Sequence, residues 1–252
     1  MRYALLSDIH ANLPALEAVL ADLGRRGVDG TYHLGDLVGY APWPDETVRL
    51  LEAQGIAGVA GNYDSTVGLD YAHCGCRYED ARQEALSHES FEWTKAHTSG
   101  AVRASLAALP FRMDLRPLGG HTGGPKLILV HGAPTLNTLY WTEDRDDAFC
   151  LKMAEAAGAR SGDLIAFGHT HLPWTREVGG IRFLNTGSVG RPKDRDPRAG
   201  YVIVEAEPAG MGVEFVRVDY DVARAADAIR ASELPDEFAV YLETGGARLD
   251  PA

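Results

Sequence analysis

Polar side chains that can bind a metal follow five short apolar runs, each close to the point where the run ends. Such runs are typical of buried strands. In open α/β sheets, the loops beyond the carboxyl ends of the strands meet at one edge. Five separate strand ends would therefore deliver these side chains to one rim. The seven side chains are Asp8, His10, Asp36, Asn62, His131, His169 and His171.

Each motif taken alone has an ordinary structural interpretation. A single Asp or His after a strand is usually a turn former or a helix N-cap, and the His-Thr-His run at 169–171 can be a solvated edge. Five motifs that carry only oxygen and nitrogen donors are better explained by one metal cluster. A pair of divalent ions suits the hydrolysis of phosphate esters. Asp36 is then the carboxylate that bridges the ions, and Asn62 supplies a neutral oxygen.

The motifs SDIH, GDLVGY, GNYD, VHGAP and GHTH, in this order, resemble those of the calcineurin-like metallophosphoesterase superfamily. The match extends over residues 1 to about 190, and the segment Asn185–Asp194 is similar to a late motif of the small bacterial and archaeal phosphodiesterase branch. The resemblance implies two divalent ions and attack by a hydroxide that bridges them. It implies one ion held by Asp8, His10 and His171, another held by Asn62, His131 and His169, and Asp36 bridging. The donors favour Mn or Fe, and Zn or Ni also fits.

Tyr63 departs from the family pattern, because many members have His at this position. The imidazole that would contact the substrate phosphate and assist the leaving group is therefore missing. A phenol carries protons poorly at neutral pH. The replacement favours phosphodiester over phosphomonoester hydrolysis. Tyr63 is expected to act in catalysis with Asp36, Asn62 and His131, and packing against the rim is the alternative interpretation.

The run GDLVGY is a second departure. Gly39 and Tyr40 stand where the protein Ser/Thr phosphatases of the superfamily have a run with a phosphate-binding Arg. The missing guanidinium argues against a phosphoprotein phosphatase and, less strongly, against a dinucleoside tetraphosphatase. Arg191 in the late loop is a candidate substitute, although an Arg in a Gly/Pro loop is more often a solvated surface residue.

The expected function is hydrolysis of phosphodiester bonds in small, nucleotide-like substrates. The alternatives are a dinucleoside polyphosphate hydrolase, a phosphomonoesterase, or a binding scaffold of the same fold without activity. Asp64 and Thr170 are expected to orient the ligating imidazoles. Tyr140 and Trp141 are candidates for lining the substrate cleft, although aromatic residues in long loops often only anchor the loop.

The succession of apolar runs predicts an α/β fold. Many consecutive strands in the second half of the chain favour two packed sheets over one doubly wound sheet. A four-layer αββα sandwich of two mixed β-sheets flanked by helices is also what the resemblance implies. The expected strands cover residues 3–7, 31–34, 56–60, 111–118, 126–130, 164–167, 174–178, 181–185, 200–205 and 213–218.

Residues 1–252 are expected to form one domain. A helical cap is inserted at residues 65–110, with helices over Glu79–Lys95 and Ser99–Leu109, and a plain surface pair of helices is the alternative. The closing segment, 221–243, is helical by pattern with a break at Pro235, and it is expected to cover a sheet face.

Charge and cysteine content limit the partners. The net charge of -12 is unfavourable for binding a long nucleic acid, whereas a small phosphate-ester substrate is allowed because bound cations offset part of the charge. No apolar run is long enough for a membrane span and no secretory signal is seen, so a cytoplasmic protein without a membrane partner is expected, with an oligomer allowed. Cys74, Cys76 and Cys150 are expected to form no disulfide, and the first two lack the usual zinc spacing.

Overall fold

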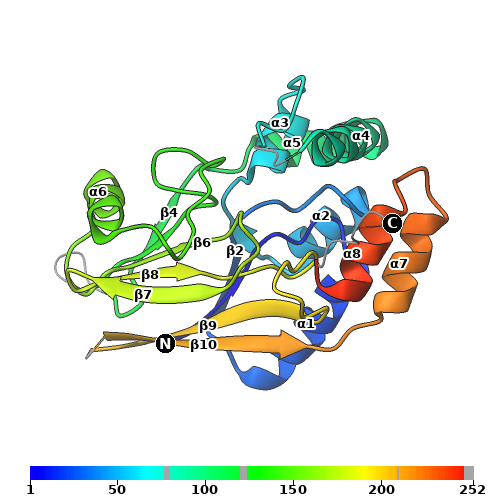
Figure 1. The fold of residues 1–252 in the computed structure, drawn as a ribbon. Helices are drawn as coiled ribbons and strands as arrows, with labels where there is room; N and C mark the ends of the chain where they lie inside the picture. Colours follow the sequence, from blue (N-terminus) through cyan, green and yellow to red (C-terminus); the bar gives the residue numbers. More distant parts are fainter. Residues whose placement is uncertain (77–79, 120–123, 209, 247–252) are drawn as a thin grey trace.

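The computed structural model describes residues 1–76, 80–119, 124–208 and 210–246. Two five-stranded mixed sheets form its centre (Figure 1). The first sheet consists of β1 (Arg2–Leu6), β2 (Gly30–His33), β3 (Ala57–Gly58), β9 (Ala199–Glu207) and β10 (Gly210–Val218), in the order β10-β9-β1-β2-β3. The second consists of β4 (Met113–Leu115), β5 (Leu127–Leu129), β6 (Leu164–Phe167), β7 (Trp174–Val178) and β8 (Ile181–Asn185), in the order β4-β5-β6-β8-β7.

Alternation along β1 shows how the layers are separated. Tyr3 and Leu5 face the second sheet and pack with Leu129 of β5, whereas Ala4 and Leu6 face the helices on the other side. This is the period of two expected for a strand that is buried on both faces. The sheets therefore share an apolar layer, and the predicted sandwich of two mixed sheets is confirmed.

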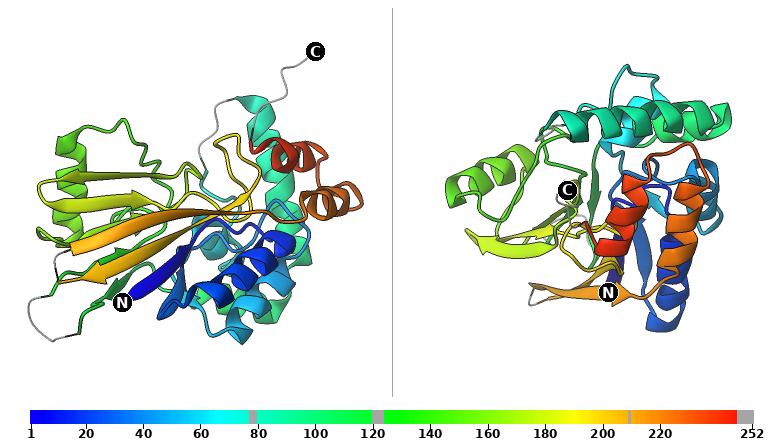
Figure 2. Two further views of the ribbon diagram at one scale, coloured as in Figure 1. Left: turned by 90° about the horizontal axis from the view of Figure 1, so that it is seen from below. Right: turned by 45° about the vertical axis from the view of Figure 1, so that its right-hand side comes forward.

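Helices cover the outer faces of both sheets. The first sheet is covered by α1 (Leu13–Arg26) and α2 (Pro44–Ala53). The second is covered by α6 (Asp147–Ala157), which lies on the opposite side of the molecule (Figure 2). The start of α1 is well defined, because the Asn12 side chain accepts a hydrogen bond from the Ala15 N–H. The turn between β1 and α1 is thus fixed at the end where the helix begins.

Helices follow the third strand, as the sequence predicts. They are α3 (Asn62–Gly68), α4 (Ala81–His97) and α5 (Gly100–Ala107), and they lie together at one end of the molecule (Figure 1). The expected helices over 79–95 and 99–109 are confirmed, although Glu79 lies outside the described residues. The role of this segment as a cap stays a prediction.

The closing segment forms α7 (Val222–Arg230) and α8 (Glu237–Thr244), and the chain turns near Pro235. The expectation that it covers a sheet face was wrong. Ala225, Ile229 and Phe238 pack with Ala41 and Leu86 in a cluster drawn from helices and loops. The outer face of the first sheet is already covered by α1 and α2, so the last two helices extend the layer sideways. Within the described residues, none of the helices is both long and apolar enough to cross a bilayer.

Candidate metal centre

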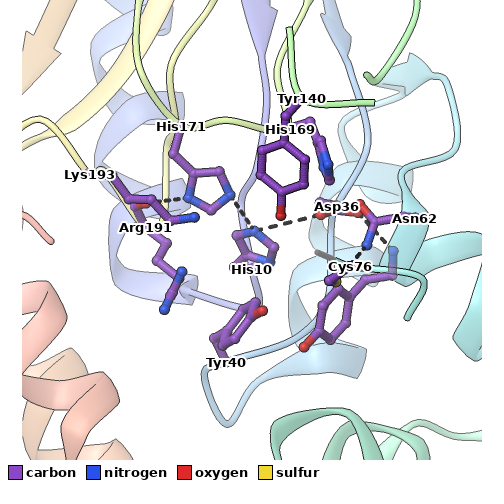
Figure 3. Close-up of a pocket in the computed structure, with 11 residues that line it drawn as sticks. His10, Asp36, Tyr40, Asn62, Cys76, Tyr140, His169, His171, Arg191 and Lys193 are labelled. Carbon is purple, nitrogen blue, oxygen red and sulfur yellow. Dashed lines mark hydrogen bonds and ion pairs between the residues drawn. The ribbon is translucent and has the colours of Figure 1, made fainter. Parts of the chain in front are cut away.

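The structure brings all seven predicted side chains to one rim. Figure 3 shows His10, Asp36, Asn62, His169 and His171 among them. They lie beyond the carboxyl ends of β1, β2, β3, β5 and β6. Two triads have ligand atoms within 4.8 Å of one another: Asp8 with His10 and His171, and Asp36 with His131 and His169. Asn62 completes the second triad, because its Oδ1 lies 3.1 Å from His131 Nε2.

The backbone at the rim is strained. Five of the seven residues have positive φ angles: Asp8 52°, His10 51°, Asp36 53°, His169 64° and His171 62°. A non-glycine residue in this region costs on the order of 1–3 kcal/mol, and such residues cluster at functional sites. Contacts between loops hold them in place. The Asp8 N–H donates to Gly35 O at 3.0 Å, and the His10 N–H donates to Asp36 O at 2.9 Å.

The tautomers of His10 and His171 follow from their carbonyl partners. His10 Nδ1 lies 3.1 Å from Val38 O, and His171 Nδ1 lies 2.6 Å from Arg191 O. Because a carbonyl only accepts, each Nδ1 carries the proton and donates. The two Nε2 atoms, 3.1 Å apart, then present lone pairs to each other. Facing lone pairs repel unless a cation lies between them, so this arrangement fits a bound metal ion.

The second triad is oriented in the same way. His131 Nδ1 donates to Leu34 O at 2.7 Å. Once it is deprotonated, as metal binding requires, its Nε2 turns a lone pair toward Asn62 Oδ1 at 3.1 Å and Asp36 Oδ2 at 3.4 Å, and His169 Nδ1 lies 3.2 Å away. Oxygen and nitrogen acceptors that converge with no donor between them are what a divalent ion requires.

Two buried atoms of the ligand side chains have no hydrogen-bond partner in the described part of the chain. They are Asp8 Oδ1 and His169 Nε2. A buried polar atom left without a partner costs about 1–3 kcal/mol, and more when it is charged. Asp8 Oδ1 points toward the first triad, at 3.2 Å from His171 Nε2. The residues therefore fit divalent metal ions.

Burial keeps most of these imidazoles neutral, as metal binding requires. Burial and the neighbouring His171 lower the pKa of His10 to about 3. Burial and His131 lower the pKa of His169 to about 3. Burial, with the charges of Lys193 and Arg191, holds the pKa of His171 well below its usual value.

Asp36 and His131 form the charged pair of the centre. Burial alone would raise the pKa of Asp36, but His131 and two further histidines hold it below its usual value. Burial opposes protonation of His131, and the Asp36 carboxylate outweighs this and raises the pKa of His131 to about 9. Asp36 is therefore a carboxylate at neutral pH, which is the form that can bridge two ions.

A disulfide joins Cys74 and Cys76 beside Asn62. The prediction of no disulfide was wrong, because Gly75, with φ of 71°, turns the chain and brings the two Cα atoms to 5.4 Å, within the range for disulfides. The Asn62 amide NH2 donates to Cys74 O at 3.2 Å, and it lies 3.4 Å from Cys76 Sγ. This contact turns the Asn62 oxygen toward the centre.

Asp64 and Thr170 were expected to orient the ligating imidazoles, but they make their hydrogen bonds elsewhere. The Asp64 carboxylate accepts from the N–H groups of Leu37 and Gly61 at 2.8 and 2.9 Å, so it holds two ligand loops together. Thr170 Oγ1 accepts from the Asn185 amide at 2.9 Å. Backbone carbonyls orient the imidazoles instead, and these are contributed by loops that the sequence does not place.

Tyr63 lies almost completely buried, with 1% of its surface exposed. Its hydroxyl is oriented toward α4, 3.5 Å from Ser87 O and 3.4 Å from Ser90 Oγ. Burial raises the pKa of the Tyr63 phenol well above its usual value. These contacts favour packing against the rim, and a catalytic role for Tyr63 stays a prediction.

A polar pocket opens over the ligands (Figure 3). Tyr140 lines it, with its ring centroid 4.3 Å from that of His169, whereas Trp141 is fully buried against Phe167 in the core beneath α6. Arg191 is only 9% exposed, so its interpretation as a solvated surface residue was wrong. Lys193 and Cys76 line the pocket without having been predicted, although Lys193 follows Arg191 by two residues in the same motif.

Comparison with known proteins agrees with this geometry. The chain matches the calcineurin-like phosphoesterase superfamily domain over residues 1–208, and it belongs to this family. It is 31% identical to the MJ0912 protein of Methanocaldococcus jannaschii over 255 residues, which cover 92% of this chain and 93% of that protein. It is 27% identical to the phosphodiesterase YfcE of Escherichia coli over 208 residues, which cover 78% of this chain and 84% of YfcE.

A solved structure is similar over nearly the whole chain. It is a metallophosphoesterase from Sphaerobacter thermophilus, 31% identical, with a TM-score of 0.73 over 97% of this chain and 99% of that one. The predicted superfamily and its small bacterial and archaeal branch are confirmed. The protein is therefore a calcineurin-like phosphoesterase with candidate ligands for two metal ions.

Proposed function

We propose that this protein hydrolyses phosphodiester bonds of small, nucleotide-like substrates with the help of two divalent ions, of which Mn or Fe is favoured. The main support for metal dependence is that the Nε2 atoms of His10 and His171 lie 3.1 Å apart with their lone pairs facing each other. The preference for diesters is supported by Tyr63 in place of an imidazole and by the named activity of the relative YfcE. The first ion would be held by Asp8, His10 and His171, the second by Asn62, His131 and His169, and Asp36 would bridge them.

Divalent ions bound there supply Lewis acidity toward phosphoryl oxygens and a hydroxide nucleophile at neutral pH. The chain itself supplies orientation. Backbone carbonyls of Val38, Leu34 and Arg191 hold three imidazoles in the tautomer whose Nε2 faces the centre. The neutral Asn62 amide keeps the negative charge low enough for an anionic substrate to approach. The Tyr63 phenol, bonded toward α4, offers the leaving group little acid assistance.

The proposal predicts metal-dependent cleavage of bis-p-nitrophenyl phosphate. Protein stripped with a chelator is expected to be inactive, and Mn²⁺ is expected to restore activity. Cleavage of p-nitrophenyl phosphate should be slower by about 10-fold or more, because the proposed centre favours the transition state of the diester by about 1.4 kcal/mol or more. The measurement is release of p-nitrophenolate from each ester at equal protein and metal concentrations.

Two other results would change the assignment. Faster cleavage of the monoester would favour a phosphomonoesterase, and cleavage of dinucleoside polyphosphates alone would favour that class of hydrolase. Inactivity on every ester, with metal still bound, would favour a binding scaffold of the same fold.

Tyr63→Phe is expected to keep kcat for the diester within about 3-fold of wild type. The substitution removes only a hydroxyl whose contacts, at 3.4 and 3.5 Å, are long. Tyr63→Ala serves as the comparison, because it empties a buried site and should lower stability by about 3 kcal/mol or more. A fall in kcat of roughly 100-fold in folded Tyr63→Phe would instead assign Tyr63 a role in proton transfer.

A further inference from the structure

The Arg191 guanidinium is held by aromatic rings at the edge of the pocket. Its Cζ lies 4.1 Å from the ring centroid of Tyr40, 4.9 Å from that of Tyr241 and 5.7 Å from that of Phe238. Contacts of this kind attract a cation and fix its plane without using its N–H groups. Arg191 is 9% exposed, and its Nε has no hydrogen-bond partner among the residues that the structure describes.

The last helix supplies two of the three rings that contact Arg191. Phe238 and Tyr241 belong to α8, beyond residue 208, where the match to the family domain ends. The same helix end is attached to the late loop, because the Arg195 N–H donates to Gly245 O at 2.8 Å. The segment after the family domain therefore positions a side chain at the pocket, a role that its sequence pattern does not indicate.

Arg191 and Lys193 add positive charge on the side of the pocket that holds His10 and His171 (Figure 3). Among the described residues, Asp36 is the one carboxylate that lines this pocket, and it faces the ligands of the centre. The carboxylates of Asp8 and Asp36 balance only half of the charge of two divalent ions. The Arg191 guanidinium increases this excess, and like charges held together in a partly buried site are unfavourable. A ligand with more than one negative group would remove the imbalance.

We propose that Arg191 and Lys193 form an anion subsite that binds a phosphate group of the substrate other than the one hydrolysed. This rests on the proposed function and narrows its substrates to phosphodiesters that carry a further phosphate. Arg191 presents planar donors suited to phosphate oxygens, and Lys193 adds a flexible point charge. Tyr40, Phe238 and Tyr241 are positioning residues that act through Arg191.

A matched pair of esters tests the subsite. One is thymidine 5′-(p-nitrophenyl phosphate), and the other carries an added 3′-phosphate. With Mn²⁺-loaded wild-type protein, kcat/KM is expected to be about 10-fold higher for the ester with the 3′-phosphate. The two esters should differ in KM and not in kcat, because the subsite contact stabilises the bound substrate and the transition state equally. Arg191→Gln and Lys193→Gln should each reduce this preference to about 3-fold or less.

Two further variants separate the subsite from general effects. Arg195→Gln removes an equal charge from an exposed position in the same loop and should keep the preference. Tyr241→Leu removes one of the aromatic contacts and should give a preference between those of wild type and Arg191→Gln. A preference that survives Arg191→Gln and Lys193→Gln, or that falls equally in Arg195→Gln, would overturn the proposal.

Binding without turnover gives an independent readout. Calorimetric titration of the same Mn²⁺-loaded proteins compares thymidine 3′,5′-bisphosphate with thymidine 5′-monophosphate. Wild type should bind the bisphosphate about 10-fold more tightly, and Arg191→Gln and Lys193→Gln should lose this difference. Equal affinities in wild type would overturn the subsite. If neither ester is cleaved but the bisphosphate preference depends on Arg191, the proposed diesterase activity fails while the subsite stands.

Discussion

Asp36→Ala is expected to lower kcat/KM for bis-p-nitrophenyl phosphate by roughly 1,000-fold or more. Divalent ions contribute several kcal/mol of transition-state stabilisation, and this magnitude corresponds to at least three powers of ten in rate. Asp36 lies 3.4 Å from His131 and 3.8 Å from His10, one histidine from each triad, so its removal affects both halves of the centre. The measurement is steady-state hydrolysis at saturating Mn²⁺.

Asp36→Asn separates the charge from the shape of the side chain. The Asp36 Oδ1 accepts the Tyr63 N–H at 2.9 Å, and an amide oxygen can keep this bond. Asp36→Asn should therefore unfold in urea closer to wild type than Asp36→Ala does, yet lose activity to a similar extent. Metal analysis should show fewer bound ions per chain in both variants.

Asp163→Asn is the matched control. Asp163 is also buried, and it accepts from the N–H groups of Lys126 and Arg160 at 2.7 and 2.8 Å. It lies at the opposite ends of β5 and β6 from the ligands, so its replacement should lower stability while activity per folded molecule is retained. Comparable loss of activity in Asp163→Asn and Asp36→Asn would mean that destabilisation, and not loss of a bridging carboxylate, explains both.

The strands were predictable because their local signals agree with the tertiary structure. The predicted bounds of β6, β7 and β8 coincide with the observed ones, since each strand ends next to Gly or at Asn. The helices α2 and α6 were missed despite local signals. Pro44 with Asp45 and Glu46 begins α2, and Asp146 caps α6. Attention to these N-terminal residues would have found both helices.

The ligand set was predictable, and its orientation was not. Each ligand follows a strand in the sequence, whereas the carbonyls of Val38, Leu34 and Arg191 that fix the imidazoles lie 28, 97 and 20 residues from their partners. Such contacts depend on how the loops meet. The same reason explains Arg191, whose burial depends on rings of α8 that lie far along the chain. The disulfide at Cys74 depended on a local turn at Gly75.

Gly61→Ala is expected to lower the free energy of unfolding by about 2–3 kcal/mol and to lower activity per folded molecule by roughly 100-fold. Gly61 precedes α3 with an ordinary φ of −79°, so space, and not backbone conformation, requires glycine here. A Cβ at this position would meet the backbone N and the Oδ1 of Asp36. The GDLVGY and GNYD loops would have to separate, which moves the bridging carboxylate away from Asn62.

Gly24→Ala provides the opposite case. Gly24 lies in α1, and in the described part of the chain an added Cβ would meet no atom within 4 Å apart from its own neighbours and helix backbone. Ala should therefore stabilise the protein by about 0.5–1 kcal/mol and leave activity unchanged. Urea unfolding in the presence of a chelator measures both variants without a contribution from bound metal. If Gly61→Ala is as stable and as active as Gly24→Ala, the close approach of the two ligand loops does not position Asp36.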